Sequence, residues 1–424
     1  MGMSFRLAAV KVLTKKMKRS KVEGRAKRKR RSLLKPVPRP AVAAAAATAT
    51  AVPGFPEDVL MEILARLPAK SLMRFKCVSK LWSSIISSRY LTNLFLRASS
   101  PLRFMYLTDK YGHALLLTAA PQYAAEKFCG LHIEVTVPEV GGCLVNALRG
   151  LMCFRIGGRR YRICNVTTKQ QVELPLVKSS LVLEDGSNTW SHFGYDPIQD
   201  AYKVLSLVWG ITQDKVMRWE HQVLVLGPGA SWRRSNTTQS VAPHRPYSQG
   251  ISMDGVLYYG AWAGEESTCV LVSFDMSSED FNLIELPLEA GITWDTRATN
   301  LMKYRGKIAV FDYTRLSSEG SIDLWVVEHA GKSQWSNKTT LVPPIRGIAL
   351  LPRGDLFIQG TSREGTIRCF VNRFSSMHIL FDLETSETIR QVVLSSEFRG
   401  HPLEPESLHM SYCDLSESIM YLEA

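Results

Sequence analysis

The chain lacks the short sequence patterns that mark many enzymes and metal proteins. No Gly-x-Ser-x-Gly nucleophile elbow, Walker-type phosphate loop or His-Glu-x-x-His motif occurs in its 424 residues. The histidines show no helical metal spacing, and no Cys-x-x-Cys pair is present. The Gly227-Pro228-Gly229 run is a poor phosphate cradle, because proline has no N–H to donate. We therefore expect no catalytic residue, no metal site and no cofactor.

Features of membrane and secreted proteins are also missing. Nowhere do 18 strongly apolar residues follow one another, and no secretory leader is visible. We therefore expect no membrane partner. Without a secretory leader, scattered cysteines are predicted to be small core residues rather than disulfides or metal ligands. The eight cysteines are Cys77, Cys129, Cys143, Cys153, Cys164, Cys269, Cys369 and Cys413.

Acidic residues are nearly absent from the start of the chain. Residues 1–39 contain 15 Lys or Arg and the single acid Glu23, a net charge of +14, whereas the whole chain has 52 basic and 39 acidic residues. The remainder therefore holds 37 basic and 38 acidic residues, a net charge of −1. The basic character belongs to the N-terminal segment, and the rest of the chain is electrically balanced.

Two basic clusters within this segment are typical of a nuclear-import signal or a non-specific nucleic-acid patch. A solvated leader and a mitochondrial leader are alternatives. No aromatic residue is interleaved with the clusters, so stacking on bases is not supported, and we do not favour a nucleic-acid partner. The predicted location is the nucleus, the cytoplasm or both. The import candidates are Lys15, Lys16, Lys18, Arg19, Lys27, Arg28, Lys29, Arg30 and Arg31.

A low-complexity stretch rich in proline and alanine follows the basic clusters. Pro36, Pro38 and Pro40 lead into the alanine run of residues 43–47. The stretch has too little large apolar surface to build a core, so it is interpreted as a linker. Residues 1–52 are therefore predicted to be a disordered basic tail and linker.

Residues 53–97 have the pattern of a small helical unit. Pro56 can occupy a first helical turn, where its missing N–H is no loss, and Pro68 ends that helix. A second short helix is predicted over residues 69–76, and Ser79 is placed to cap a third. Three helices of this size cannot bury all their apolar groups among themselves, so a surplus apolar face should meet another protein. The first helical face carries Val59, Leu60, Ile63, Leu64 and Leu67.

The run from Pro56 to Trp82 closely resembles the F-box, the module that connects substrate receptors to the Skp-type adaptor of SCF ubiquitin ligases. Phe55 stands where the family usually has leucine, which keeps an apolar contact. The resemblance implies binding to a Skp-type adaptor and, through it, to a cullin scaffold. The adaptor-binding residues that it implies are Phe55, Pro56, Ile63, Leu64, Leu67, Pro68, Leu72, Phe75, Val78 and Trp82.

From about residue 98 to residue 424, short β-rich runs replace the helical pattern. They are separated by Gly, Asp, Ser and Pro, which is typical of an antiparallel all-β domain. The clearest of these runs are residues 223–226, 256–259, 308–311, 324–327 and 378–381.

The β-rich region also repeats itself. The segment 274–279 recurs as 381–386, and a related turn lies at 164–169. Turns ending in Trp232 and Trp335 lie between them. Equivalent positions at 165, 227, 275, 328 and 382 are 62, 48, 53 and 54 residues apart, a period close to that of kelch-like propeller blades. The predicted fold is a small three-helix F-box followed by an all-β, kelch-like propeller of about six blades.

A second resemblance supports this organisation. The segment 193–197 followed by 202–204 is similar to the signature of plant F-box-associated domains. The segments 164–170 with 173–175, and 253–260, are also similar to it, although the family normally has Asn-Pro where Asn165-Val166 stands. Behind an F-box, such a domain implies a receptor for a protein substrate.

The leading hypothesis is a non-catalytic specificity subunit of an SCF-type ubiquitin ligase with an unknown protein target. It would act by holding the target close to the ubiquitin-charged enzyme. One alternative is a propeller enzyme, because an active site can be assembled from distant loops around a channel. Another is a nuclear regulator that binds nucleic acid through residues 15–31.

Overall fold

The structure is a computed structural model of the chain. It describes residues 56–98, 103–106, 114–118, 128–130, 132–137, 143–183, 185–211, 217–235, 241–264, 268–292, 299–341, 356–360, 365–371, 377–385, 387–393, 397–398, 401–402 and 412–422. The basic clusters, Phe55 and the alanine-rich stretch lie outside these ranges.

The helical unit contains four helices in the order in which the chain runs. They are α1 (Glu57–Ala65), α2 (Ala69–Phe75), α3 (Lys80–Ser87) and α4 (Arg89–Ala98). Pro56 and Pro68 are the N-cap residues of α1 and α2, and the Ser79 hydroxyl accepts a hydrogen bond of 3.2 Å from the Trp82 N–H at the start of α3. These three helices confirm the predicted ones.

The fourth helix differs from the prediction of three. The Ser88 hydroxyl accepts a hydrogen bond from the Leu91 N–H at 3.2 Å, so a second serine caps a helix directly after α3. Leu91 and Phe95 lie one turn apart on the buried side of α4. Only nine residues separate the start of α4 from the Ser79 cap, and no separate helix was predicted after the one that Ser79 caps.

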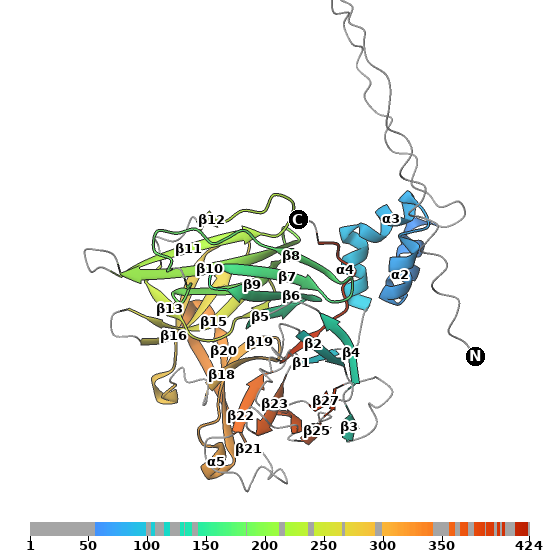
Figure 1. Cartoon of the computed structure of the whole chain (residues 1–424). Helices are drawn as coiled ribbons and strands as arrows, with labels where there is room; N and C mark the ends of the chain where they lie inside the picture. The colour runs from blue at the N-terminus through green and yellow to red at the C-terminus, as the bar shows by residue number, and fades with distance from the viewer. Residues whose placement is uncertain are drawn as a thin grey trace, which may run out of the picture. The chain divides into compact units, whose positions relative to one another are not determined.

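The β domain is dominated by five successive sheets of four or five strands (Figure 1). The first contains β5 (Cys143–Leu148), β6 (Leu151–Gly157), β7 (Arg160–Asn165) and β8 (Gln170–Glu173). The second contains β9 (Thr189–Asp196), β10 (Ala201–Ile211), β11 (Met217–Val225) and β12 (Arg233–Arg234). The third contains β13 (His244–Pro246), β14 (Ile251–Met253), β15 (Val256–Ala263), β16 (Thr268–Asp275) and β17 (Phe281–Glu285).

The fourth sheet contains β18 (Thr299–Tyr304), β19 (Lys307–Asp312), β20 (Ser321–His329) and β21 (Gln334–Leu341). The fifth contains β22 (Leu356–Gly360), β23 (Thr366–Val371), β24 (Met377–Asp382) and β25 (Glu387–Val393), and β3 (Phe128–Gly130) joins it as a parallel edge strand. Short helices are η3 (Leu288–Ala290), α5 (Leu316–Glu319) and η4 (Ala330–Lys332).

Among the remaining described strands, one pair connects the two ends of the β domain. The strand β1 (Arg103–Tyr106) pairs antiparallel with β28 (Tyr412–Leu415), although about 300 residues separate them in the chain. The strand β2 (Ala114–Thr118) pairs with β4 (His132–Val137), and β26 (Glu397–Phe398) pairs with β27 (His401–Pro402). An early strand thus closes on a late one, which removes an open sheet edge, as in a propeller.

Contacts between successive sheets also have the arrangement expected of a propeller. Strands of successive sheets lie beside one another: β5 lies beside β9, β9 beside β14 and β15, and β18 beside β22. Hydrophobic side chains then fill the space between successive sheets, and the buried residues include Phe193, Tyr259 and Phe311. This arrangement confirms the predicted all-β, propeller-type fold, while the count of about six blades stays a prediction.

The repeated sequence segments 164–169, 274–279 and 381–386 are equivalent turns, each of which begins at the end of β7, β16 or β24 and leads into the next strand of the same sheet. The side-chain oxygen of Asn165 accepts hydrogen bonds from the N–H groups of residues 167 and 168. Asp275 and Asp382 do the same with the residues two and three positions further on. Each Asn or Asp therefore supplies a local acceptor that fixes the turn, which explains why the pattern recurs with the blade period.

The two predicted turn tryptophans connect neighbouring sheets. The Trp232 indole N–H donates to the Pro175 carbonyl at 2.7 Å, and the Trp335 N–H donates to the Glu285 carbonyl at 2.8 Å. In each case the acceptor lies at or just beyond the last strand of the preceding sheet. The rings thus contribute apolar packing and satisfy a backbone carbonyl between sheets.

The five cysteines whose burial the structure describes differ in exposure, and Cys269 is half-buried. Cys153 and Cys164 are buried and free, as predicted for core residues, and burial raises the pKa of the Cys164 thiol to about 12. Cys77 and Cys143 are exposed, so the prediction of core positions is wrong for these two. Both lie at or beside the end of an element, Cys77 after α2 and Cys143 at the start of β5, where side chains reach solvent.

Candidate docking surface

The helical unit has a core of its own. The helices α1 to α4 bury Leu64, Leu72, Ile86, Leu91 and Phe95 almost completely. Leu64 and Leu72, two of the predicted adaptor-binding residues, are 1% and 0% exposed and therefore support the surface from inside. A partner that binds the unit in this conformation would therefore contact side chains other than Leu64 and Leu72.

Several large apolar side chains of the same unit remain uncovered. Val59 and Ile63, one turn apart on α1, are 45% and 46% exposed. Phe75 at the end of α2 is 37% exposed, and Val78 in the α2–α3 connection is 67% exposed. Burial of a side chain of this kind is worth about 1.5–3 kcal/mol, so the uncovered group has much to gain from a partner.

Of these four, Ile63, Phe75 and Val78 are predicted adaptor-binding residues, whereas Val59 was predicted only as part of the apolar helical face. Other predicted adaptor-binding residues lie around them. Trp82 is half-buried and its ring lies 5.7 Å from the Phe75 ring, which joins α3 to the end of α2. Leu67 is half-buried, and Pro56 and Pro68 are exposed at the helix starts. We name six exposed or half-buried large apolar side chains of this unit the docking surface: Val59, Ile63, Leu67, Phe75, Val78 and Trp82.

The C-terminal segment completes the core beneath this surface. Ile419 is fully buried among the helices, together with Leu64 and Leu91. Its neighbours Met420 and Leu422 instead pack in the core of the first two sheets of the β domain. Residues 419–422 thus contribute alternately to the core of the helical unit and to that of the β domain. This role was not predicted, because nothing in the local sequence Ser418-Ile419-Met420 indicates it.

Hydrogen bonds hold the C-terminal segment in place. The Asn165 amide donates to the carbonyls of Ser418 and Met420 at 3.0 and 2.8 Å, in addition to fixing its own turn. The Leu422 N–H donates to the Gln170 side-chain oxygen at 3.2 Å. The turn that carries the blade-repeat pattern therefore also anchors the chain segment that reaches into the helical core.

A polar contact adds to this connection between helix α4 and the β domain. The Asn93 amide donates to the Asp200 carboxylate at 3.1 Å, and its carbonyl accepts from the Arg149 guanidinium. Arg149 also lies over the Tyr195 ring at 4.0 Å, and Tyr195 donates to Asp200. The family-like segment around residue 195 thus takes part in holding α4.

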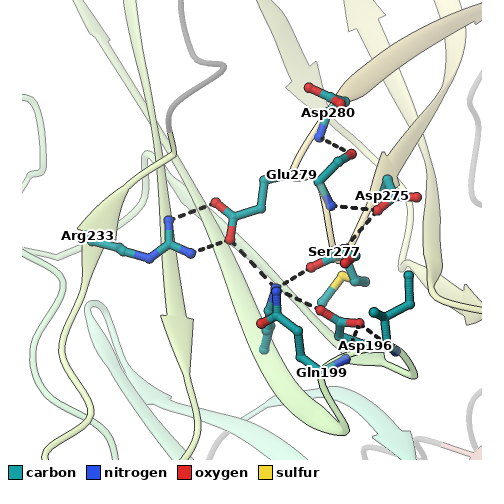
Figure 2. Close-up of polar contacts among 11 residues, drawn as sticks. Asp196, Gln199, Arg233, Asp275, Ser277, Glu279 and Asp280 are labelled. Carbon is teal, nitrogen blue, oxygen red and sulfur yellow. Dashed lines mark hydrogen bonds and ion pairs between the residues drawn. The ribbon is translucent and has the colours of Figure 1, made fainter.

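A buried group of charges joins the second and third sheets (Figure 2). Lys203 on β10 is 1% exposed; its ammonium lies 3.0 Å from the Asp196 carboxylate and 3.7 Å from that of Glu279. It also donates to the Met276 carbonyl. Glu279 in turn accepts two hydrogen bonds from Arg233, one of them at 2.8 Å, and Figure 2 shows this pair facing each other.

Asp196 is the turn acceptor of this group. Burial alone would raise the pKa of its carboxyl, but hydrogen bonds from the Gln199 N–H and from Lys203 more than offset this, so the pKa lies below its ordinary value. The carboxylate also accepts from the Ile198 N–H. Asp196 and Lys203 belong to the segments 193–197 and 202–204 that resemble F-box-associated domains. Their contacts hold two sheets together, which is a structural role.

Three histidines lie close together inside the β domain. Such a cluster at a central channel would favour the alternative of a propeller enzyme. His192, His221 and His244 contact one another or the shared rings of Tyr259 and Phe281. All three are at most 3% exposed. Burial, together with the nearby His244, lowers the pKa of His192 and His221 to about 3. They are therefore neutral and closed to solvent at pH 7, which does not favour a catalytic role.

Metal and membrane features are absent from the described part of the chain. There, no group of three or more His, Cys, Asp or Glu is arranged to hold a metal ion. Nor does that part contain a helix with the length and apolar character needed to cross a membrane. The import candidates from Lys15 to Arg31 lie outside the described residues, and their role stays a prediction.

Comparison with known families matches both parts of the chain. A model of the F-box domain matches residues 53–94, and a model of the F-box associated beta propeller domain matches residues 103–410. An F-box protein of Arabidopsis thaliana, At3g52320, is 46% identical over 365 residues, which cover 82% of this chain and 90% of that protein. The F-box/kelch-repeat protein At4g19930 of the same plant is 34% identical over 387 residues, which cover 87% and 85% of the two chains.

These matches define a class of protein with an F-box followed by an F-box-associated propeller. The chain belongs to this family of plant-type F-box proteins. Among solved structures, an oligogalacturonate lyase in complex with manganese covers 72% of this chain with a TM-score of 0.35 and 8% identity, which is too distant to indicate a function.

Proposed function

We propose that the protein is a non-catalytic substrate receptor of an SCF-type ubiquitin ligase. The docking surface binds a Skp-type adaptor, which connects the chain to a cullin scaffold. The propeller-type domain holds a protein target. The observation that carries the proposal is the group of large apolar side chains that the helical unit leaves exposed while burying a complete core beneath them.

The proposed mechanism requires no nucleophile from this chain. A bound target has its lysines held near the ubiquitin-charged enzyme, which raises their effective concentration. The buried C-terminal segment and the Asn93 contacts support this mechanism, because they limit movement of the docking surface relative to the β domain. A receptor that keeps its target at a fixed distance from the adaptor restricts which lysines are reached.

Cys77 provides a direct test of adaptor binding in the native chain. It is exposed between Phe75 and Val78 of the docking surface, whereas Cys143 is exposed on the β domain. With a Skp-type adaptor at about 100 times its Kd, we expect maleimide labelling of Cys77 to slow by about tenfold or more, because only the free fraction reacts. Cys143 should keep its rate. Labelling is followed site by site with mass spectrometry.

Two outcomes would contradict the proposal. The first is an unchanged Cys77 rate at an adaptor concentration that saturates an established F-box protein. The second is equal slowing at Cys77 and Cys143, which would indicate non-specific association.

A further inference from the structure

Arg245 occupies an unusual position at the junction of the second and third sheets. It lies on β13, directly opposite Trp262 of β15 in the sheet register. Its guanidinium is 5.7 Å from the centre of the Trp262 ring and 5.6 Å from that of Trp209, which belongs to β10 of the neighbouring sheet. The cation therefore lies within reach of two indole faces contributed by two different sheets.

The surroundings of Arg245 are aromatic and open to solvent. Arg245 is exposed, and Trp209, Trp262 and Tyr247 are half-buried. The Tyr247 ring lies 4.2 Å from that of Trp262. We name Arg245, Trp209, Trp262 and Tyr247 the Arg245 patch.

The guanidinium of Arg245 differs from comparable arginines of the chain in its hydrogen bonding. Arg305 also lies over an aromatic ring, that of Tyr304 at 5.4 Å, but it pairs with the Glu384 carboxylate at 2.6 Å. Arg149 lies over Tyr195 and donates to Asn93. Within the described residues, Arg245 has neither a hydrogen bond nor an ion pair to its guanidinium.

This geometry suits the recognition of a carboxylate. Aromatic contacts engage the faces of a guanidinium and restrict its orientation, while its N–H donors point outward along the edge. Two parallel N–H groups fit the two oxygens of a carboxylate in a bidentate pair. Tryptophan, tyrosine and arginine are also the residues that dominate binding energy at protein interfaces.

We propose that the Arg245 patch binds an acidic segment of the protein target, with a Glu or Asp carboxylate on Arg245 and an apolar neighbour on the aromatic rings. The inference rests on the proposed function and specifies its substrate class. A carboxylate fits better than a phosphate, because one guanidinium balances one negative charge, whereas a phosphate carries up to two and is typically bound by an arginine cluster.

Oriented peptide libraries test the proposal without a known target. The full chain, bound to its adaptor, is immobilised and exposed to three libraries that differ only at a fixed central residue: Glu, Gln or phosphoserine. We expect the Glu library to be retained about tenfold more than the Gln library, since a hydrogen bond to a charged carboxylate is stronger than one to a neutral amide. Enriched sequences should carry an apolar residue beside the Glu.

Variants identify the residue responsible. Arg245→Gln should abolish the preference for Glu over Gln, and Arg245→Lys should retain only part of it, because an ammonium cannot form the bidentate pair. Arg305→Gln is the matched control, since it removes an arginine that lies on an aromatic ring but already has a carboxylate partner. It should keep the full preference.

Three results would overturn the inference: equal retention of the Glu and Gln libraries, stronger retention of the phosphoserine library, or an unchanged preference in Arg245→Gln. Adaptor binding is measured on the same samples and should be equal in all variants. Failure of the wild-type chain to bind the adaptor would contradict the proposed function, whereas failure of the Glu preference alone would contradict only the assignment of the Arg245 patch.

Discussion

Replacing Lys203 with methionine is expected to destabilise the β domain by about 3–5 kcal/mol, the usual cost of removing one partner of a buried ion pair. Lys203 is the cation nearest to Asp196, which is 0% exposed, and it also contacts Glu279 and the Met276 carbonyl across two sheets. Without the ammonium, the Asp196 carboxylate stays buried without a counter-charge. Chemical denaturation with urea measures the loss as a lower unfolding midpoint.

Two further variants separate the charge effect from lost packing. Lys307→Met removes an ammonium that pairs with Glu328 at the surface, where both side chains are at least 33% exposed, and should cost less than about 1 kcal/mol. The double variant Lys203→Met with Asp196→Asn should recover part of the stability, because asparagine keeps the turn acceptor and removes the unpaired charge. A Lys203→Met midpoint equal to that of Lys307→Met would contradict the structural role of this group.

Replacing Ile419 with alanine is expected to destabilise the helical unit from the far end of the sequence. Ile419 is fully buried in the core that contains Leu64 and Leu91, and removal of such a side chain costs about 2–5 kcal/mol. The loss should appear as faster amide hydrogen exchange in residues 56–98 and as weaker adaptor binding.

Tyr421→Ala is the control for this prediction. Tyr421 is two residues away and 53% exposed, and its main contact is with Lys76, whose ammonium lies 4.9 Å from the ring centre. Loss of an exposed cation–π contact should cost about 0.5–1 kcal/mol. If Ile419→Ala leaves exchange in the helices unchanged, the C-terminal segment does not complete their core.

Local sequence signals predicted most of the helical unit. Proline at the starts of α1 and α2 and the Ser79 cap of α3 act within a few residues, so their effect is visible in the sequence. The prediction that Ile63, Phe75 and Val78 bind a partner came from the family resemblance. Helical spacing alone could not provide it, because it does not distinguish the exposed Ile63 from the buried Leu64.

The blade repeat was predictable for a similar reason. Asn165, Asp275 and Asp382 begin equivalent turns and bond to backbone two and three residues ahead, so the same kind of residue recurs in the three sheets that contain this turn. Trp232 and Trp335 were predictable as turn residues, whereas their carbonyl partners, Pro175 and Glu285, lie about 50 residues earlier and could not be identified from the sequence.

Long-range partners account for what sequence reasoning missed. Ile419 is more than 300 residues from the helices it completes, and its local sequence does not distinguish it from a surface residue. The position of Arg245 between two tryptophans could not be predicted from the sequence. It depends on the sheet register, which places Arg245 opposite Trp262, and on the neighbouring sheet, which contributes Trp209. Such juxtapositions depend on the assembled fold rather than on any short motif.

The central claim is that the apolar residues left exposed on the helical unit are covered by an adaptor. Calorimetric titration of a Skp-type adaptor into the full chain and into Ile63→Asp tests it directly, with Leu288→Asp as control, because Leu288 is 97% exposed on the β domain. Ile63→Asp should weaken binding by about a hundredfold or more, since an unpaired carboxylate in an apolar interface costs about 3 kcal/mol or more. Equal affinity of the two variants for the adaptor would contradict the claim.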